Sequence, residues 1–278
     1  RPPLYPIFLG ALMAAFPDYW QVAAVLIQGV LGVLCALLVF MLVRYLGGER
    51  RSAIVALLLF AAHPLFQLEV VARRETVLFT VVLLGYFILL LRHPRPYLAL
   101  GMLAGIAHLL RPNGMLLEFA VLALALSEFR NTAKRRILLN SMISLAAFLV
   151  VIFPWQATIY RMTGMIQITS SITGTQTRWK GHNPYFTTIY PYIDVDYLEP
   201  IMYSLAERGG QTVKQKDAEL DRLVLEYIME DPAAFLKRTL QKFLVYLAPF
   251  PTPLGKGNLM FSEGKAHLVD FEPRNRWL

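Results

Sequence analysis

Long apolar runs separated by short polar turns occupy the first 153 residues of the chain. Because about 20 predominantly apolar helical residues cross a bilayer, runs of this kind predict membrane helices. The pattern predicts spans over residues 21–43, 52–68, 77–91 and 137–153, and a hairpin of two shorter apolar helices over 97–110 and 115–126. A further apolar segment, 7–16, is too short to span. We therefore expect an all-α polytopic integral membrane protein with at least six membrane helices.

The remaining sequence is more polar, and we divide it into a large loop region (154–231), a membrane or interfacial helix (232–250) and an irregular tail (251–278). Within the loop, residues 214–230 place apolar side chains on one stripe and charged ones opposite, which predicts an amphipathic helix. Asp231 followed by Pro232 is typical of a helix start, so a second helix is predicted over 232–247. The tail is rich in Pro, Gly and charge, which favours loop.

Basic residues are distributed unequally between the two sets of short loops. One set carries nine, at Arg44, Arg50, Arg51, Arg92, Arg95, Arg130, Lys134, Arg135 and Arg136. The other carries three, at Arg73, Arg74 and Arg111. Cytoplasmic loops of membrane proteins are enriched in Lys and Arg, so the first set is predicted to be cytoplasmic. The RPPLYP segment (1–6), the Arg73–Glu75 turn, the Arg111 turn and the 154–231 loop then share the outer face.

Composition supports the membrane class and excludes others. Of the 278 residues, 56% are hydrophobic and 17% are charged, against about 25% charged in soluble domains. The net charge of +8 could suggest nucleic acid, but the basic residues lie in short loops between apolar helices, so no nucleic-acid partner is expected. The single cysteine, Cys35, excludes an internal disulfide. The chain starts with Arg1, which suggests that it begins inside a longer protein or has been processed.

Catalytic signatures such as a P-loop, GxSxG or HExxH are absent, which leaves acid, arginine and amide groups at the predicted outer surface. Glu75, beside Arg73 and Arg74, could bind a hydroxyl-rich ligand or act as a base. Alternatively, it pairs with one of these arginines or stabilises the N-terminus of the following helix. Both interpretations stay open from the residues alone.

Arg111 begins a tight RPNG turn, and arginine binds phosphate well through paired donors. The alternative is snorkelling to lipid headgroups. The RWKGHN run offers donors and an aromatic face that suit a sugar or a diphosphate, or else forms an ordinary interfacial loop; its polar residues are Arg178, Lys180, His182 and Asn183. Asp194 and Asp196 could pair on a metal, but a DxD pattern is common by chance, and no metal site is predicted.

Five short motifs in a fixed order carry a family resemblance. They are RPPLYPIFLGAL with a later GGERR turn, Arg74-Glu75-Thr76, GMLAGIAHLLRPNG (101–114), PWQATIYRMTG continuing to GHNPY (154–185), and DPAAFLKRTLQKFLVYLAPFP (231–251). Together they resemble the polyprenyl-phosphate-sugar-dependent membrane glycosyltransferases of the GT-C fold. That group includes the protein O-mannosyltransferases and the lipid A aminoarabinose transferases. In the fourth motif, His182 replaces the first Asn of the family's turn.

The resemblance implies an enzyme that passes a sugar from a polyprenyl phosphate to a protein, lipid or glycan acceptor, without a cofactor, at the outer face of what we expect to be a bacterial plasma membrane. In such enzymes an acid in the first outer loop activates or orients the acceptor, and by position Glu75 would be the second-rank acid of the site. Arg74, Arg111, Arg178, Lys180, His182 and Asn183 would bind substrate.

The resemblance also exposes a departure. In the family, a first membrane helix and a loop with the principal catalytic Asp precede the RPPLYP-like element, and further helices close the membrane domain. We therefore expect either part of a larger glycosyltransferase or a noncatalytic membrane subunit of a larger complex. A transporter or lipid carrier is less consistent with the sequence, because the predicted spans contain almost no charge.

Overall fold

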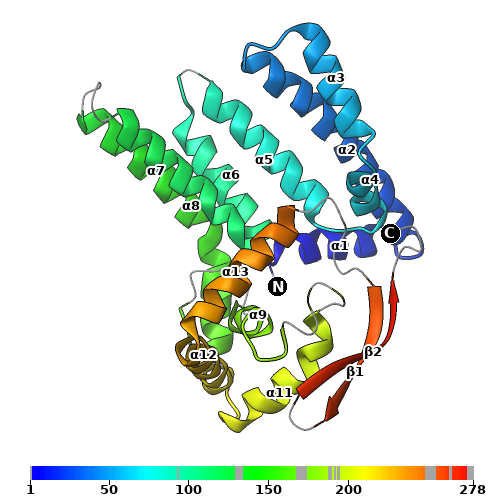
Figure 1. Cartoon of the computed structure of the whole chain (residues 1–278). Helices are drawn as coiled ribbons and strands as arrows, with labels where there is room; N and C mark the ends of the chain where they lie inside the picture. Colours follow the sequence, from blue (N-terminus) through cyan, green and yellow to red (C-terminus); the bar gives the residue numbers. More distant parts are fainter. Residues whose placement is uncertain are drawn as a thin grey trace. The chain divides into compact units, whose positions relative to one another are not determined.

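A computed structural model of the chain describes residues 2–92, 94–128, 134–166, 174–186, 190, 192, 195–247, 255–262 and 265–273. The chain forms two compact units. The first comprises Arg1–Met162 with Ile166–Ser171, and the second comprises Thr163–Met165 with Ile172–Leu278. Figure 1 labels their helices and strands along the chain. Each unit is described below by itself.

The first unit is built only of helices in its described part (Figure 1). They are α1 (Leu4–Ala15), α2 (Trp20–Tyr45), α3 (Arg50–Ala61), α4 (Pro64–Val71), α5 (Thr76–Leu91), α6 (Tyr97–Leu110), the 3-10 turn η1 (Pro112–Met115), α7 (Leu116–Glu128) and α8 (Lys134–Thr163). The helices predicted over 21–43, 77–91, 97–110 and 115–126 are confirmed to within a few residues. In space, α2 packs against α3 and α5, and α5 packs against α6.

Within the described part of the chain, two helices are long and apolar enough to cross a membrane: α2 and residues Ile137–Thr163 of α8. The pair α3 and α4 qualifies as a third if its bent halves form one span. The expectation of at least six spans is not confirmed, because α5 and α6 are apolar but shorter. At about 1.5 Å per residue, such helices fall short of a hydrocarbon core about 30 Å thick.

The surface of α2 is what a lipid-facing helix requires. Val22, Leu26, Val30, Val33 and Leu37 are all exposed. Their spacing of three or four residues places them on one face of the helix. A continuous exposed apolar stripe on a membrane-length helix is stable only against lipid or another protein. The chain is therefore an integral membrane protein.

The span predicted over 52–68 is broken near its end, and this corrects the sequence interpretation. The axes of α3 and α4 differ by 51°. His63 adopts an extended backbone, as the residue before proline prefers, and Pro64 takes the first position of α4. The His63 ring Nδ1 accepts a hydrogen bond from the Phe66 amide at 3.4 Å. His63 is thus an N-cap residue.

The predicted end of the last span at Phe153 is also wrong. α8 continues through Pro154 to Thr163, and the boundary between the two units lies at Met162–Thr163. Proline inside a helix removes one backbone hydrogen bond without always ending the helix. Here the Thr158 hydroxyl donates to the Pro154 carbonyl at 2.9 Å, within the next turn. Residues 154–163, which the sequence assigns to the start of the loop region, are therefore part of α8.

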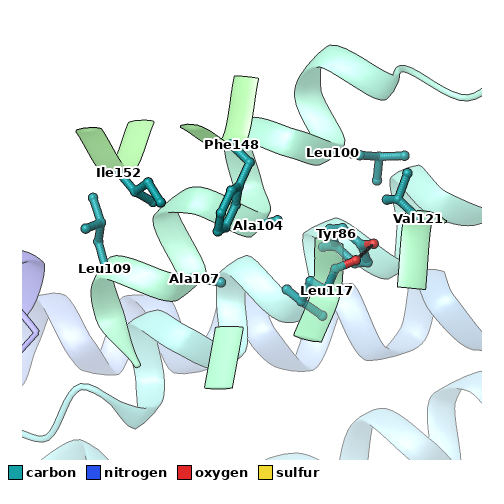
Figure 2. Close-up of a cluster of buried hydrophobic side chains, with 9 residues drawn as sticks. All are labelled: Tyr86, Leu100, Ala104, Ala107, Leu109, Leu117, Val121, Phe148 and Ile152. Atoms are coloured by element: carbon teal, nitrogen blue, oxygen red, sulfur yellow. Dashed lines mark hydrogen bonds between the residues drawn. The ribbon is translucent and has the colours of Figure 1, made fainter. Parts of the chain in front are cut away.

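The core of the first unit lies between α5, α6, α7 and α8. Figure 2 shows its nine buried members: Tyr86, Leu100, Ala104, Ala107, Leu109, Leu117, Val121, Phe148 and Ile152. The Tyr86 hydroxyl donates to the Leu117 carbonyl at 2.5 Å, so the one polar atom in this cluster is satisfied by the backbone of α7. The absence of a side chain at Gly101 lets α6 approach the Ser144 backbone of α8.

The second unit contains α9 (Gly174–Gly181), η2 (Val195–Leu198), α11 (Glu199–Arg208), α12 (Val213–Glu230), α13 (Pro232–Leu247), β1 (Gly255–Ser262) and β2 (Lys265–Pro273). Its core comprises Trp179, Leu198, Met202, Ala206, Leu220 and Val224. The helices predicted over 214–230 and 232–247 are confirmed. Thr212 and Gln215 form a capping box at α12, and Asp231 Oδ1 accepts from the Ala234 amide at 2.8 Å at α13.

The prediction of an irregular tail is wrong for residues 255–273, which form an antiparallel hairpin. Leu259 pairs with Leu268, and both pack against the core of the unit, while Asn258 and Met260 are exposed. This alternation is the period-two pattern of a half-buried strand. The Gly and charged residues of the tail obscured it. The chain is therefore mostly helical rather than all-α.

The α6–α8 contact can be tested with one methyl group. In Gly101→Ala, the added Cβ clashes with the Ser144 carbonyl. We therefore expect the free energy of unfolding to fall by about 1–3 kcal/mol, as in other overpacked cores. The measurement is the apparent melting temperature of the detergent-solubilised chain. Gly85→Ala in α5 is the matched control, because its Cβ meets no atom within 4 Å. Equal melting temperatures of the two variants would contradict the close contact.

Candidate functional site

The turn between α4 and α5 is held by two buried or half-buried side chains from distant helices. The Tyr5 hydroxyl of α1 donates to the Arg73 carbonyl, and Gln28 Nε2 of α2 lies 3.0 Å from the Tyr5 oxygen and 3.1 Å from the Arg74 carbonyl. Gln28 is fully buried. Arg73 has a φ of 53°, a conformation that is rare for residues other than glycine. The hydrogen bonds to its carbonyl and to the next one stabilise this turn.

Two ion pairs converge on the start of α5. Arg74 Nη1 lies 3.0 Å from Glu69 Oε1, and Arg111 Nη2 lies 3.2 Å from Glu75 Oε1. Thr76 links the pairs, because its hydroxyl donates to Glu69 Oε2 at 2.5 Å and accepts from Arg111 Nη2 at 2.6 Å. We call these five residues the arginine–glutamate network.

Arg111 is the most constrained cation of this network. It follows α6, and its Nε donates to Glu75 Oε1 at 3.2 Å. The guanidinium also lies over the Phe79 ring, 5.6 Å from its centroid. The side chains of Arg111 and Glu75 are 33% and 37% exposed, so a ligand can reach both. Among the described residues, the hydrogen bonds of Arg111 use Nε and Nη2 of a guanidinium with five N–H donors.

One of the two interpretations of Glu75 that the sequence left open, an ion pair with Arg73 or Arg74, is wrong. Glu75 does not pair with Arg73 or Arg74 but with Arg111, and Arg74 pairs with Glu69. Glu75 occupies the N-cap position of α5, yet its side chain makes no capping hydrogen bond. The sequence analysis did not select Glu69 or Gln28. A glutamine inside an apolar span is a signal that could have identified Gln28, because polar groups in spans are costly.

The second group of predicted residues lies in the second unit, on α9 and the turn that follows it. Arg178 Nη2 lies 2.9 Å from Asp221 of α12. Lys180 Nζ lies 2.6 Å from Asp196 and 2.5 Å from Glu199. Burial alone lowers the pKa of Lys180, but its hydrogen bonds to the two carboxylates outweigh burial and raise the pKa above its ordinary value. Both cations are thus neutralised by acids.

Asn183 and His182 have different surroundings from these cations. Asn183 is buried, and its Nδ2 donates to the Trp179 and Lys180 carbonyls at 2.8 and 2.9 Å, so it stabilises the end of α9. His182 Nδ1 lies 3.3 Å from Lys242 Nζ of α13. Burial lowers the pKa of His182, and the neighbouring Lys242 and Arg238 lower it further. The imidazole of His182 therefore lies beside two cations, Lys242 and Arg238.

A metal site was not predicted, and the described part of the chain contains no group of three or more His, Cys, Asp or Glu residues that could hold one. Asp194 of the DxD pattern lies outside the described residues. Asp196 pairs with Lys180.

Comparison with known protein families gives a match, and it covers the segment that contains the arginine–glutamate network. Residues 1–156 match the family model of dolichyl-phosphate-mannose-protein mannosyltransferase. The matched segment contains the whole arginine–glutamate network together with Tyr5 and Gln28, and it ends before the second unit begins. Searches of curated proteins and of solved structures found no significant match.

The charge surrounding Lys242 predicts a pH dependence of stability. Burial, and then the charge of Arg238, lowers the pKa of Lys242 to about 8. In the unfolded chain this pKa is about 10.4, so the unfolded state binds more protons between about pH 8 and pH 10.4. Stability should therefore rise with pH across this window. We expect the apparent melting temperature of the wild type, relative to Lys242→Met, to increase from pH 8 to pH 9.5; a constant difference would contradict the lowered pKa.

Proposed function

Because the chain belongs to the dolichyl-phosphate-mannose-protein mannosyltransferase family, we propose that it is a membrane glycosyltransferase that moves a sugar from a polyprenyl-phosphate donor to a hydroxyl group of a protein, lipid or glycan. The family supports a mannosyltransferase-like activity. The donor, the acceptor and the face of the membrane are parts of the proposal. The observation that supports it most is the Glu75–Arg111 pair, which lies half-exposed within the family-matched segment.

Glycosyl transfer requires a proton acceptor for the attacking hydroxyl. In the proposed reaction, the acceptor oxygen forms a bond to the anomeric carbon and its proton passes to the Glu75 carboxylate. The bond between that carbon and the phosphate oxygen breaks, and its electron pair stays on the phosphate. A carboxylate within hydrogen-bond reach of the hydroxyl contributes to such a step as a general base. Arg111 and Thr76 hold the Glu75 region in place from α6 and α5.

The leaving phosphate requires positive charge, which stabilises the transition state when it is oriented in advance. We assign this role to Arg111, whose guanidinium has donors beyond the two that contact Glu75 and Thr76, with Arg74 beside it. Arginine suits this role because its planar fork matches phosphate oxygens. No cofactor is needed in this scheme, because the donor already carries an activated sugar–phosphate bond.

Residues of the second unit complete the proposal. We assign Arg178, Lys180, His182 and Asn183 to substrate binding, as the motif order suggests. Arg178 and Lys180 would have to share their charge with Asp221, Asp196 and Glu199. We place the protein in a bacterial plasma membrane, and the distribution of basic residues supports an orientation with the loop region on the extracytoplasmic side.

The role of Glu75 can be tested with an isosteric change. Glu75→Gln keeps the shape but cannot accept the proton, so we expect kcat for transfer from a polyprenyl-phosphate sugar to fall by about 10²–10⁴-fold. The assay uses the protein in its native membrane context with a hydroxyl acceptor. Arg222→Gln is the matched control, because Arg222 forms an exposed ion pair on α12 of the other unit. Full activity of Glu75→Gln would show that Glu75 is not the proton acceptor and that its ion pair with Arg111 is structural. No transfer by the wild type itself would favour a noncatalytic membrane subunit.

The role of the Arg111 guanidinium can be tested with a substitution that keeps the positive charge. Arg111→Lys keeps a cation but loses the fork that contacts Glu75 and Thr76 together. We expect kcat/KM for the donor to fall by roughly tenfold or more, with kcat reduced because the phosphate is bound most tightly as it leaves. Steady-state kinetics with varied donor concentration measures this. If Arg111→Lys behaves as the wild type, the guanidinium has no role at the phosphate.

A further inference from the structure

We propose that Arg238 and Lys242 of α13, together with His182 of the turn after α9, form a binding site for a phosphate ester in the second unit. Neither cation of α13 was selected from the sequence, and the family-matched segment ends at residue 156. The three residues come from segments about 60 positions apart in the chain that the fold of this unit brings together.

The cluster is built by direct contacts. Arg238 and Lys242 are four residues apart in α13, so they share one face of the helix. Lys242 Nζ donates to the Gly181 carbonyl and lies 3.3 Å from His182 Nδ1. The same ammonium lies 4.3 Å from the centroid of the Phe186 ring.

Aromatic rings complete the surroundings of these cations. The Arg238 guanidinium lies 4.6 Å from the centroid of Tyr227, and the Phe235 ring lies 5.0 Å from the ring of His182. Such rings orient the cations without neutralising them. They also reduce the access of water, which strengthens electrostatic interactions with a bound anion.

The charge of the cluster is not balanced. Within the part of the chain that the structure describes, Arg238 and Lys242 have no carboxylate in ion-pair distance, whereas Arg178, Lys180 and Arg222 each do. One nitrogen of Arg238, Nη2, is buried and has no hydrogen-bond partner. A buried donor without an acceptor is costly. An anion that accepts from Arg238 and Lys242 would remove this cost.

The protonation behaviour agrees with this geometry. The pKa of Lys242 is lowered to about 8 by burial and by Arg238, and the pKa of His182 is lowered by burial and by both cations. Besides burial, these shifts reflect the positive charge of neighbouring cations, which no acid of the described residues compensates. A bound anion would reverse them.

Phosphate is the anion that fits the available donors. A guanidinium fork, an ammonium and an imidazole N–H can be satisfied together by the three terminal oxygens of a phosphate monoester. The opposite face of α13 carries the exposed residues Leu236, Leu240, Phe243 and Leu244, which is typical of a helix lying in the membrane interface. A lipid-linked phosphate is therefore available beside a helix of this kind. Phosphate binding stands by itself, whereas a lipid-linked donor as its source rests on the proposed function.

The test is site-specific acetylation of the full chain in lipid nanodiscs at pH 8, read by mass spectrometry. Lys237, exposed one turn away on the same helix, is the internal reference. With a pKa of about 8, about half of Lys242 is the reactive free amine. Phosphate binding returns the pKa toward its ordinary value, so we expect the ratio of Lys242 to Lys237 labelling to fall about tenfold at saturation. The probes are inorganic phosphate and geranyl phosphate, each against chloride at equal ionic strength.

Variants and the second probe decide the outcome. For each protein, acetylation of Lys242 with phosphate is compared with acetylation of the same protein without phosphate. Protection of Lys242 in the wild type and in Arg222→Gln, but not in Arg238→Gln, supports the site. Geranyl phosphate protecting at a tenfold lower concentration than inorganic phosphate supports a lipid-linked source; equal concentrations support a site for the phosphate group alone. No protection by either phosphate, equal protection by chloride, or full protection in Arg238→Gln would overturn the proposal. The labelling assay measures phosphate binding and not sugar transfer. A negative result therefore overturns the phosphate site alone, whereas the Glu75→Gln assay tests the proposed function.

Discussion

The absence of water inside a bilayer is the constraint that shapes the first unit. Backbone groups there must find partners within the protein. The turn between α4 and α5 interrupts the helical pattern, and its exposed carbonyls are satisfied by Tyr5 and Gln28. Gln28 would itself be costly inside an apolar helix without these contacts. One turn thus ties α1 and α2 to the start of α5, and it fixes the backbone from which Glu75 and Thr76 extend.

Close helix packing positions the other half of the arginine–glutamate network. Membrane helices associate through small residues that let backbones approach, since lipid tails are as apolar as leucine. Gly101 and Gly105 provide this contact between α6 and α8, and the turn that follows α6 carries Arg111. Arg111 then meets a carboxylate 36 positions earlier in the chain. The ion pair is therefore a product of two packing contacts, and its strength depends on how far they hold water away.

The cations of the second unit differ in how their charge is compensated. Arg178 and Lys180 are paired with acids of α12, η2 and α11, so a substrate would share their charge with these carboxylates. Arg238 and Lys242 have aromatic neighbours instead, and no carboxylate of the described residues lies within ion-pair distance of them. Sequence proximity favoured the first pair as binding residues, because they stand in a polar, aromatic run. The distinction between a paired and an unpaired cation is made by neighbours that are remote in the chain.

By itself, the sequence determined most of the helices, the membrane class and the family resemblance, because apolar periodicity, caps and turn residues act over a few positions. It also selected Glu75 and Arg111 as candidate residues, because both stand in short polar turns between apolar helices. The break at His63 follows a local preference of the residue before proline that the apolar run obscured. The sequence did not determine the continuation of α8 through Pro154 or the strands around Leu259, where packing outweighs local preference. The pairing of Glu75 with Arg111 rather than with Arg74, and the cluster of His182 with Lys242, were decided only by the tertiary structure. The physical reason is that electrostatic and hydrogen-bond partners are selected by distance in space, to a few ångströms, and a sequence pattern carries no such distance.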